Sequence, residues 1–344
     1  MPTNAPTRWF RRIALIAAAL AFGVVVLGAY VRLSDSGLGC PDWPTCYGHW
    51  TAGGAAQNAS AVAQAFPGQT VRYSLAIREM VHRYFAGGLG LLITALALIA
   101  VGNRRSRSLP VALPVFLFAF VILQGIFGAL TVTWQLQPII VTAHLIGGMT
   151  TLGLLGWLVM RPEVRTPGSP ERGLWGWALV GLGTLGLQLA LGGWVSSNYA
   201  AVACPDFPTC QNHWLPPMDM ADAFVLWRGL GIDYTGGVLD HPARVAIHFA
   251  HRLGAVVATI VLASVAFATL VRAGSPRLRL AALGLLAALV LQIAIGISMV
   301  LMAFPLSLAT LHNAGAALLV LAVVALLRCL KPLSTAYLPG ERRF

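Results

Sequence analysis

The segment Cys40-Pro-Asp-Trp-Pro-Thr-Cys46 returns in the second half of the chain as Cys204-Pro-Asp-Phe-Pro-Thr-Cys210. Other matches follow in the same order around it: Leu27-Gly-Ala-Tyr-Val31 with Leu191-Gly-Gly-Trp-Val195, Glu79-Met-Val-His82-Arg83 with His248-Phe-Ala-His251-Arg252, Leu123-Gln124 with Leu291-Gln292, and His144 with His312. The offset stays between 164 and 169 residues throughout. Matches in this order predict that the chain is a duplicated unit.

The composition places this duplicated unit in a membrane. Of 344 residues, 58% are hydrophobic and only 10% are charged, with a mean hydropathy of +0.77. A soluble domain of this length would need more charge on its surface. A helix needs about 20 mostly apolar residues to span the bilayer. Eight windows qualify: 12–32, 77–102, 110–133, 138–160, 173–196, 245–271, 278–303 and 306–328.

The first window resembles a signal peptide because it follows Arg8, Arg11 and Arg12. We interpret it as a span, since it is longer than a signal-peptide core and has no small-residue cleavage site before Arg32. With no presequence before it, we expect a bacterial chain.

Eight spans and one duplication predict an all-α membrane protein built as two pseudo-twofold-related four-helix bundles. Each half contributes four spans in the same orientation, as in a parallel repeat about an axis along the membrane normal. We predict an N-terminal bundle at 1–160, a cytoplasmic linker at 161–172 and a C-terminal bundle at 173–344.

The charges are distributed unevenly along the chain. The formal net charge is +12, and 22 of the 23 basic residues are Arg. They occur in small groups between apolar runs, a pattern that does not favour nucleic-acid binding. The basic residues on one side of the predicted spans are Arg8, Arg11, Arg12, Arg104, Arg105, Arg107, Arg161, Arg165, Arg172, Arg272, Arg277, Arg279, Arg328, Lys331, Arg342 and Arg343. All seven Asp lie in the two long loops on the other side. The positive-inside rule therefore predicts a multi-pass protein of the bacterial inner membrane with both termini in the cytoplasm.

Four histidines lie near the outer ends of alternate spans: His82, His144, His251 and His312. Strongly polar residues inside a span are costly and usually functional. Two per half suit axial ligation of a haem iron by two imidazoles. Zinc stays an alternative, although it would require three or four close ligands. An interhelical hydrogen bond is the other alternative for each histidine.

Three charged residues accompany these histidines. Arg83 and Arg252 each directly follow one, where a guanidinium can pair with haem propionates or serve as an interfacial anchor. Glu79 shares a helix face with His82. It can carry protons or stabilise a positive centre, or it can form a salt bridge to Arg72, Arg78 or Arg83. Since His248 takes its place in the second half, we expect chemistry only in the first.

The cysteine pairs Cys40/Cys46 and Cys204/Cys210 lie in the outer loops. Outside the cytoplasm this favours disulfides within each loop. A soft-metal site and thiol–disulfide exchange remain alternatives. Cys329, at the cytoplasmic end, is interpreted as a buried or interfacial thiol.

The combined pattern resembles the haem A synthase family from Arg8 to about Lys331. The resemblance is carried by GLGCPDWPTC at 37–46, ExxHR at 79–83, HR at 251–252 and the surroundings of His144 and His312. It implies a haem b cofactor on His251 and His312, with Arg252 at its rim. It also implies that the substrate haem O binds near His82, His144 and Arg83, and that Glu79 is essential to turnover.

The implied reaction is oxidation of the C8 methyl group of haem O to a formyl group through an alcohol. The resemblance also implies disulfides in both loops. A haem O synthase and a membrane electron partner are expected partners besides the lipid bilayer, and a homo-oligomer stays open. Two rival functions remain, a di-haem electron-transfer cytochrome and a haem transporter or chaperone.

Overall fold

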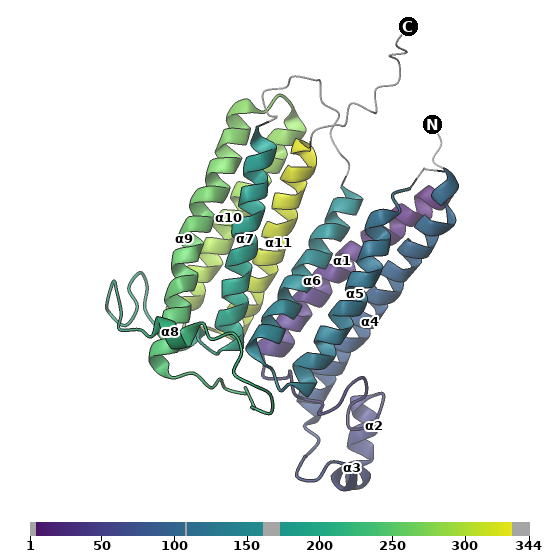
Figure 1. The fold of residues 1–344 in the computed structure, drawn as a ribbon, viewed down its shortest axis with the longest axis vertical. Coiled ribbons are helices and arrows are strands. Elements are labelled where there is room, and N and C mark those ends of the chain that lie inside the picture. Colours follow the sequence, from purple (N-terminus) through teal and green to yellow (C-terminus); the bar gives the residue numbers. More distant parts are fainter. Residues whose placement is uncertain (1–4, 107–108, 161–172, 332–344) are drawn as a thin grey trace.

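The computed structural model describes residues 5–106, 109–160 and 173–331, and within them it is helical (Figure 1). Its described part contains no β-strand beyond two isolated bridges. The helices are α1 (Ala5–Leu33), α2 (Ala52–Gln57), α3 (Ala59–Ala65), α4 (Tyr73–Gly102), η1 (Arg104–Ser106), α5 (Ala112–Thr133), α6 (Pro138–Val159), α7 (Leu174–Ser197), η2 (Ala201–Ala203), α8 (Met220–Ala223), α9 (His241–Arg272), α10 (Pro276–Leu301) and α11 (Leu306–Leu330).

Eight of these helices are long and apolar enough to cross a membrane: α1, α4, α5, α6, α7, α9, α10 and α11. They coincide with the eight predicted windows, so the prediction of an all-α, multi-pass membrane protein is confirmed. The largest differences are at helix starts: α1 begins about two turns before the predicted residue 12, and α4 and α9 begin about a turn before the predicted residues 77 and 245. Hydropathy detects only the apolar part of a helix, and these polar first turns continue it outside that part.

The spanning helices form two neighbouring groups (Figure 1). Contacts join α1, α4, α5 and α6 on one side and α7, α9, α10 and α11 on the other. Between the groups, α6 contacts α7 and α11, and α1 contacts α11. The contacts favour the predicted pair of bundles, which stays a prediction, as do the domain limits. The predicted linker 161–172 lies outside the described residues.

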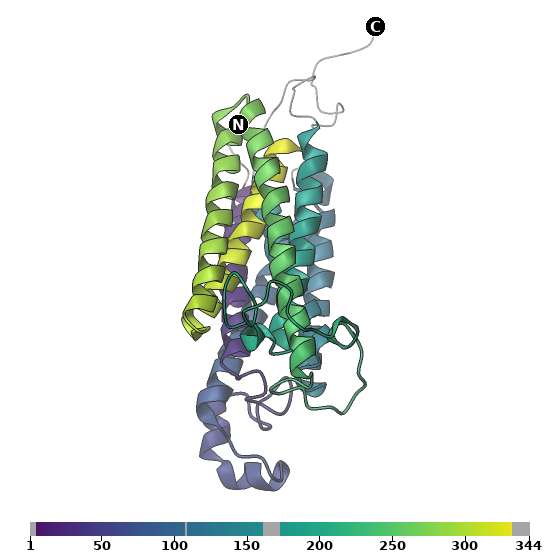
Figure 2. The same cartoon turned by 90° about the vertical axis from the view of Figure 1, so that its left-hand side faces the viewer.

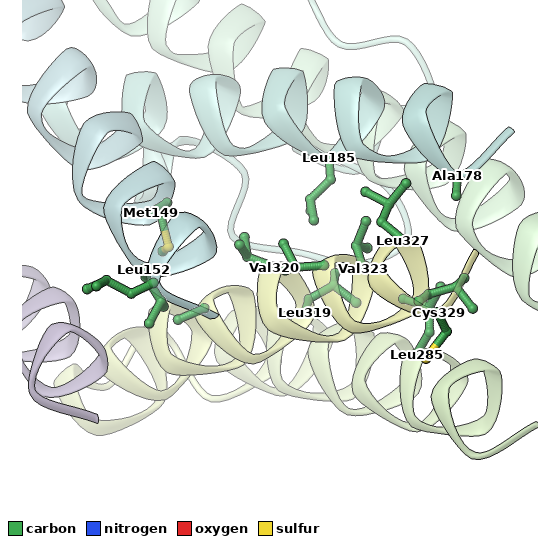
Figure 3. Packing of buried hydrophobic residues seen from close by; sticks show 14 of the residues in the cluster. Met149, Leu152, Ala178, Leu185, Leu285, Leu319, Val320, Val323, Leu327 and Cys329 are labelled. Carbon is green, nitrogen blue, oxygen red and sulfur yellow. The ribbon is translucent and has the colours of Figure 1, made fainter. Parts of the chain in front are cut away.

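Close packing of α6 against α11 joins the groups, and Figure 3 shows part of the buried cluster there, with Met149 and Leu152 of α6 and Val320 of α11. Gly153 and Gly156 have no side chain, so Val320 and Val324 approach the α6 backbone directly. Small residues permit such close approach in membranes. Cys329 is buried at the end of α11, as expected for a buried thiol.

The backbone repeats its unusual conformations between the halves. Gln135 and Leu136, between α5 and α6, have positive φ angles of 49° and 62°. Ala303 and Phe304, between α10 and α11, have 58° and 59°. Non-glycine residues rarely adopt this region, so two consecutive ones in each half mark the same tight turn. The duplication therefore extends to local geometry that the sequence alignment does not reveal.

Figure 2 shows that α2 and α3 project beyond the ends of the spanning helices, on the side of the two long loops. The start of α1 and the end of α11 lie at the opposite end (Figure 1). This arrangement leaves the four histidines at the loop end of the molecule.

Candidate functional site: two histidine pairs and one cavity

Each of the four histidines lies against a glycine of a neighbouring helix. In the first half, a Cβ atom added at Gly28 would lie 2.8 Å from Cε1 of His82, and one added at Gly128 would lie 3.6 Å from Cε1 of His144. In the second half, the distances are 3.2 Å from Gly192 to Cε1 of His251 and 3.0 Å from Gly296 to Cε1 of His312. Four histidine–glycine contacts at repeat-equivalent positions mean that each half holds its imidazoles between helices in the same way.

The first half contains a cavity of about 600 Å³. That is a usual size for a site that binds a small molecule or cofactor. His82, His144, Glu79 and Arg83 all line it, so four of the predicted site residues come together. His251, His312 and Arg252 are not among its lining residues.

The wall of this cavity is mostly apolar, and it includes residues from both groups of helices. Trp43 and Trp50 line it from the outer loop. The second half contributes Gly192, Gly193, Ser196 and Asn313. The packing of the two groups of helices therefore completes one part of the cavity wall.

Glu79 is nearly fully buried, with 4% of its surface exposed, and both carboxylate oxygens have partners. Arg83 donates through Nη2 to Oε1 at 2.5 Å, and the backbone N–H of Cys40 donates to Oε2 at 2.9 Å. The salt bridge to Arg83, one of the alternatives raised by the sequence, is thus present. It does not exclude a role in chemistry, because Glu79 also lines the cavity.

The arginines that follow His82 and His251 hold the outer loops. Arg83 donates to the carbonyl oxygen of Thr45 at 2.6 Å, and Arg252 donates to that of the equivalent Thr209 at 2.7 Å. Arg252 also donates to the carbonyl oxygen of Cys204 at 3.0 Å. The two guanidinium groups thus have protein partners, and pairing with propionates stays a prediction for both.

Both cysteine pairs form disulfides, Cys40–Cys46 and Cys204–Cys210, which confirms the predicted pairing. An aspartate closes each loop. Asp206 accepts hydrogen bonds from the Thr209 hydroxyl and from the N–H groups of Gln211 and Asn212. Burial alone would raise the pKa of Asp206, but these hydrogen bonds outweigh it and lower that pKa below its ordinary value. Each loop is therefore closed by a disulfide and by hydrogen bonds to one aspartate.

The hydrogen-bond partners of the histidines differ between the two halves. Gln188 Nε2 lies 3.1 Å from Nδ1 of His251, and Gln292 Nε2 lies 3.3 Å from Nε2 of His312. In the first half, by contrast, Nδ1 of His82 and Nδ1 of His144 are buried and have no hydrogen-bond partner among the described residues.

The donor sets fit haem better than zinc. Across residues 5–106, 109–160 and 173–331, no three His, Cys, Asp or Glu side chains gather as a metal cluster. Two imidazoles per half suit the two axial positions of a haem iron. Glycine at each histidine and apolar cavity walls suit a large flat ring. His82 and His144 would hold one ring in the cavity, and His251 and His312 a second ring in the other half.

Sequence reasoning missed several residues of these sites. Gln188 was detectable as a strongly polar residue inside a span. The match of Gln124 with Gln292 was visible, but its relation to the histidines was not. Arg32 and Asn313 carry no motif, and only the packing of the two halves brings them to the cavity.

Comparison with known proteins gives relatives over nearly the full length. The chain is 41% identical to the haem A synthase of Shewanella oneidensis over 321 residues, covering 92% of this chain and 94% of the relative. It is 29% identical to the haem A synthase of Caulobacter vibrioides over 337 residues (90% and 92%). It is 27% identical to that of Rhizorhabdus wittichii over 343 residues (93% and 92%).

A family model described as cytochrome oxidase assembly protein matches residues 11–324. The match extends from the first spanning helix into the last and includes both histidine pairs and both disulfide loops. The chain therefore belongs to the COX15-CtaA family of cytochrome oxidase assembly proteins.

Proposed function

We propose that this protein is a haem A synthase, a membrane oxidoreductase that converts the C8 methyl group of haem O to a formyl group. The observation that carries the proposal is the cavity in the first half, where two imidazoles and one buried carboxylate line the same apolar space. The names of the full-length relatives support the same activity.

In this proposal His82 and His144 hold the iron of haem O, and the apolar wall holds the ring. Gly28 lets the imidazole of His82 lie against α1. Trp43 and Trp50 border the outer side of the cavity, where they limit the access of water to the substrate. Fixing a substrate in this way supplies orientation, which can account for a large part of a rate enhancement.

Glu79 is the proposed proton acceptor. If water supplies the oxygen, the methyl group and one water give the alcohol, two protons and two electrons. Oxidation of the alcohol to the formyl group releases two more protons and two more electrons. Arg83 and the Cys40 N–H hold the carboxylate in place. A membrane electron acceptor would take the electrons. A carboxylate buried beside the reacting ring can take up a proton or stabilise positive charge on the substrate carbon.

In the second half, His251 and His312 would hold haem b. This cofactor supplies one-electron transfer when bound. The contact of Gln188 with Nδ1 of His251 supports a tightly held group, because a hydrogen bond to the second ring nitrogen fixes the orientation of a ligating imidazole. A glutamine amide turned so that its oxygen faces Nδ1 would accept the N–H and leave Nε2 free for iron.

We also propose that the long loops face the periplasm and that both termini lie in the cytoplasm. The start of α1 and the end of α11 lie at one end of the molecule and the disulfide loops at the other (Figure 1). The distribution of Arg supports this orientation. Reporter fusions should be active in the periplasm when placed between α1 and α4, α5 and α6, α7 and α9, or α10 and α11, and inactive there when placed in the other connections.

The test is co-expression with an enzyme that makes haem O, followed by extraction and chromatography of the haems bound to the purified chain. Haem O or haem A beside haem b supports the proposal. Haem b alone, two per chain, would support a di-haem cytochrome, and bound but unconverted haem O a transporter.

A matched pair of variants makes this experiment specific. Glu79→Gln should abolish haem A while haem O stays bound, because the carboxylate is lost and the cavity keeps its shape. His248→Gln changes the repeat-equivalent position in the other half and should leave conversion intact. Normal haem A output from Glu79→Gln at unchanged haem content would contradict the assigned role.

A further inference from the structure

Arg32 is the one basic residue of the cavity that sequence reasoning left without a role. It lies in the last turn of α1 and lines the cavity of the first half. Its Nη2 donates to the carbonyl oxygen of Ser196 at 2.7 Å, at the end of α7. Its guanidinium carbon lies 4.2 Å from the ring centroid of Tyr199. Arg32 therefore reaches from the first half to the second.

The charges of the cavity do not balance without an anion. Apart from histidines and Tyr84, which is neutral at pH 7, the ionisable residues among its lining residues are Arg32, Glu79 and Arg83. Glu79 and Arg83 pair at 2.5 Å and neutralise each other. Arg32 forms no salt bridge within the described part of the chain, and its Nε is buried without a hydrogen-bond partner there. One unneutralised positive charge thus lies in a largely apolar cavity.

Such a charge is costly unless a counter-ion neutralises it. A carboxylate is the natural partner, because guanidinium–carboxylate hydrogen bonds are among the strongest in proteins. Arg32 lies four residues after Gly28, the glycine against His82, so it is about 6 Å further along the helix toward the outer loops. An anionic edge of a ring held by His82 and His144 would therefore meet Arg32 on the loop side.

The second half lacks an equivalent group. At the repeat offset, the position that matches Arg32 is Ser196, whose carbonyl oxygen accepts its hydrogen bond. Arg83, the residue assigned to propionates from the sequence, is occupied by Glu79 and by loop carbonyl groups. Of the two arginines that line the cavity, Arg32 is thus the one whose Nε–H has no partner among the described residues.

We propose that Arg32 binds a propionate carboxylate of the substrate porphyrin and that this contact fixes the ring's orientation in the cavity. The inference rests on the proposed function, since it takes haem O as the ligand. Because Arg32 also contacts α7, substrate binding is sensitive to the packing between the two halves.

The test compares binding of haem O with binding of its dimethyl ester, which lacks both carboxylates. Purified full-length protein is titrated with each, and the change in haem absorption is followed. We expect the wild type to bind the free acid about tenfold to a hundredfold more tightly, as for a hydrogen bond to a charged group. Arg32→Gln should bind both forms equally, and Arg32→Lys should keep part of the preference.

Arg78→Gln is the matched control. Arg78 is also a basic residue near the outer end of a spanning helix, but it stacks on Tyr30 and does not line the cavity. This variant should keep the full preference for the free acid. Haem b retained by each variant reports an intact second half.

Several results would overturn the proposal: a wild type that binds both forms equally, or an Arg32→Gln variant that keeps the preference. A loss of affinity for both forms in equal measure would assign Arg32 to packing alone. The wild-type comparison requires no variant to fold. A preference for the free acid without conversion of haem O would retain the anchor and reject the proposed function.

Discussion

The two histidine pairs occupy equivalent places in a duplicated scaffold, yet their surroundings differ. His82 and His144 border an open cavity, and their Nδ1 atoms have no partner among the described residues. His251 and His312 each have a glutamine within hydrogen-bonding distance. The difference teaches how one scaffold can serve two purposes. Histidines whose second ring nitrogen has no hydrogen-bond partner suit a haem that exchanges, and histidines held by such a partner suit a haem that stays bound.

A pair of substitutions between the halves explains the difference at His251. Gln188 fits beside it because position 254 is glycine, where a Cβ atom would lie only 2.3 Å from the glutamine Oε1. At the equivalent positions of the first half stand Val24 and Phe85. A glutamine at position 24 would have no such gap. The glutamine and the glycine therefore depend on each other.

Removing a ligand from either pair should break the comparison most strongly. We expect His251→Ala and His312→Ala to lower the amount of copurifying haem per chain by more than about tenfold. Even the loss of a hydrogen-bond partner of a ligating histidine can lower affinity by that factor. His82→Ala should retain the copurifying haem and lose only added haem O. Measuring haem per chain by absorption of purified protein checks this.

Equal loss of copurifying haem from variants of either half would show that both pairs hold permanent haem. That outcome would favour a di-haem cytochrome over the enzyme. The control for each variant is that both disulfides have formed in the purified protein, which shows that it has folded.

Substitution of two glycines in the first half should have effects of intermediate size. Gly28→Ala would place a Cβ atom 2.8 Å from His82 Cε1, and Gly128→Ala only 3.6 Å from His144 Cε1. We expect Gly28→Ala to displace the imidazole and to lower haem O turnover by up to about 100-fold, as for an ångström-scale misplacement. Gly128→Ala makes an ordinary van der Waals contact and should retain activity. Turnover assays of the two variants side by side test this, and equal activities would show that His82 moves freely.

The smallest expected effect concerns the outer shell of the second half. Gln188→Val gives this half the residue found at the equivalent position of the first. We expect roughly a tenfold weaker hold on haem b, because the His251 ring loses the group that orients it. The rate at which haem b transfers to an apo-globin measures this hold.

Gln124→Val is the control, because it makes the same substitution at a glutamine of the first half, although the position equivalent to Gln188 is already Val24. Gln124 lies against Gly147 and leaves Nδ1 of His144 without a partner, so the release rate of haem b should not change. If Gln188→Val released haem b as slowly as the wild type, the glutamines would not distinguish the halves.

Much of the fold could be predicted from the sequence because its signals are local. A span requires a long apolar run, and all eight were found. The disulfides follow from pairs of cysteines six residues apart within one loop. The start of α1 was missed by about two turns and the starts of α4 and α9 by about one, since hydropathy says nothing of a polar helical extension.

The sequence by itself determined which residues could hold haem, because histidines repeated inside spans are rare and costly. Only the tertiary structure decided which pair borders a cavity, since that depends on side chains from helices far apart in the chain. It also decided that Glu79 pairs with Arg83, and that Arg32 meets Ser196 across the two halves. Spacing in the sequence fixes what lies on one helix face, whereas contacts between helices depend on how their surfaces pack together.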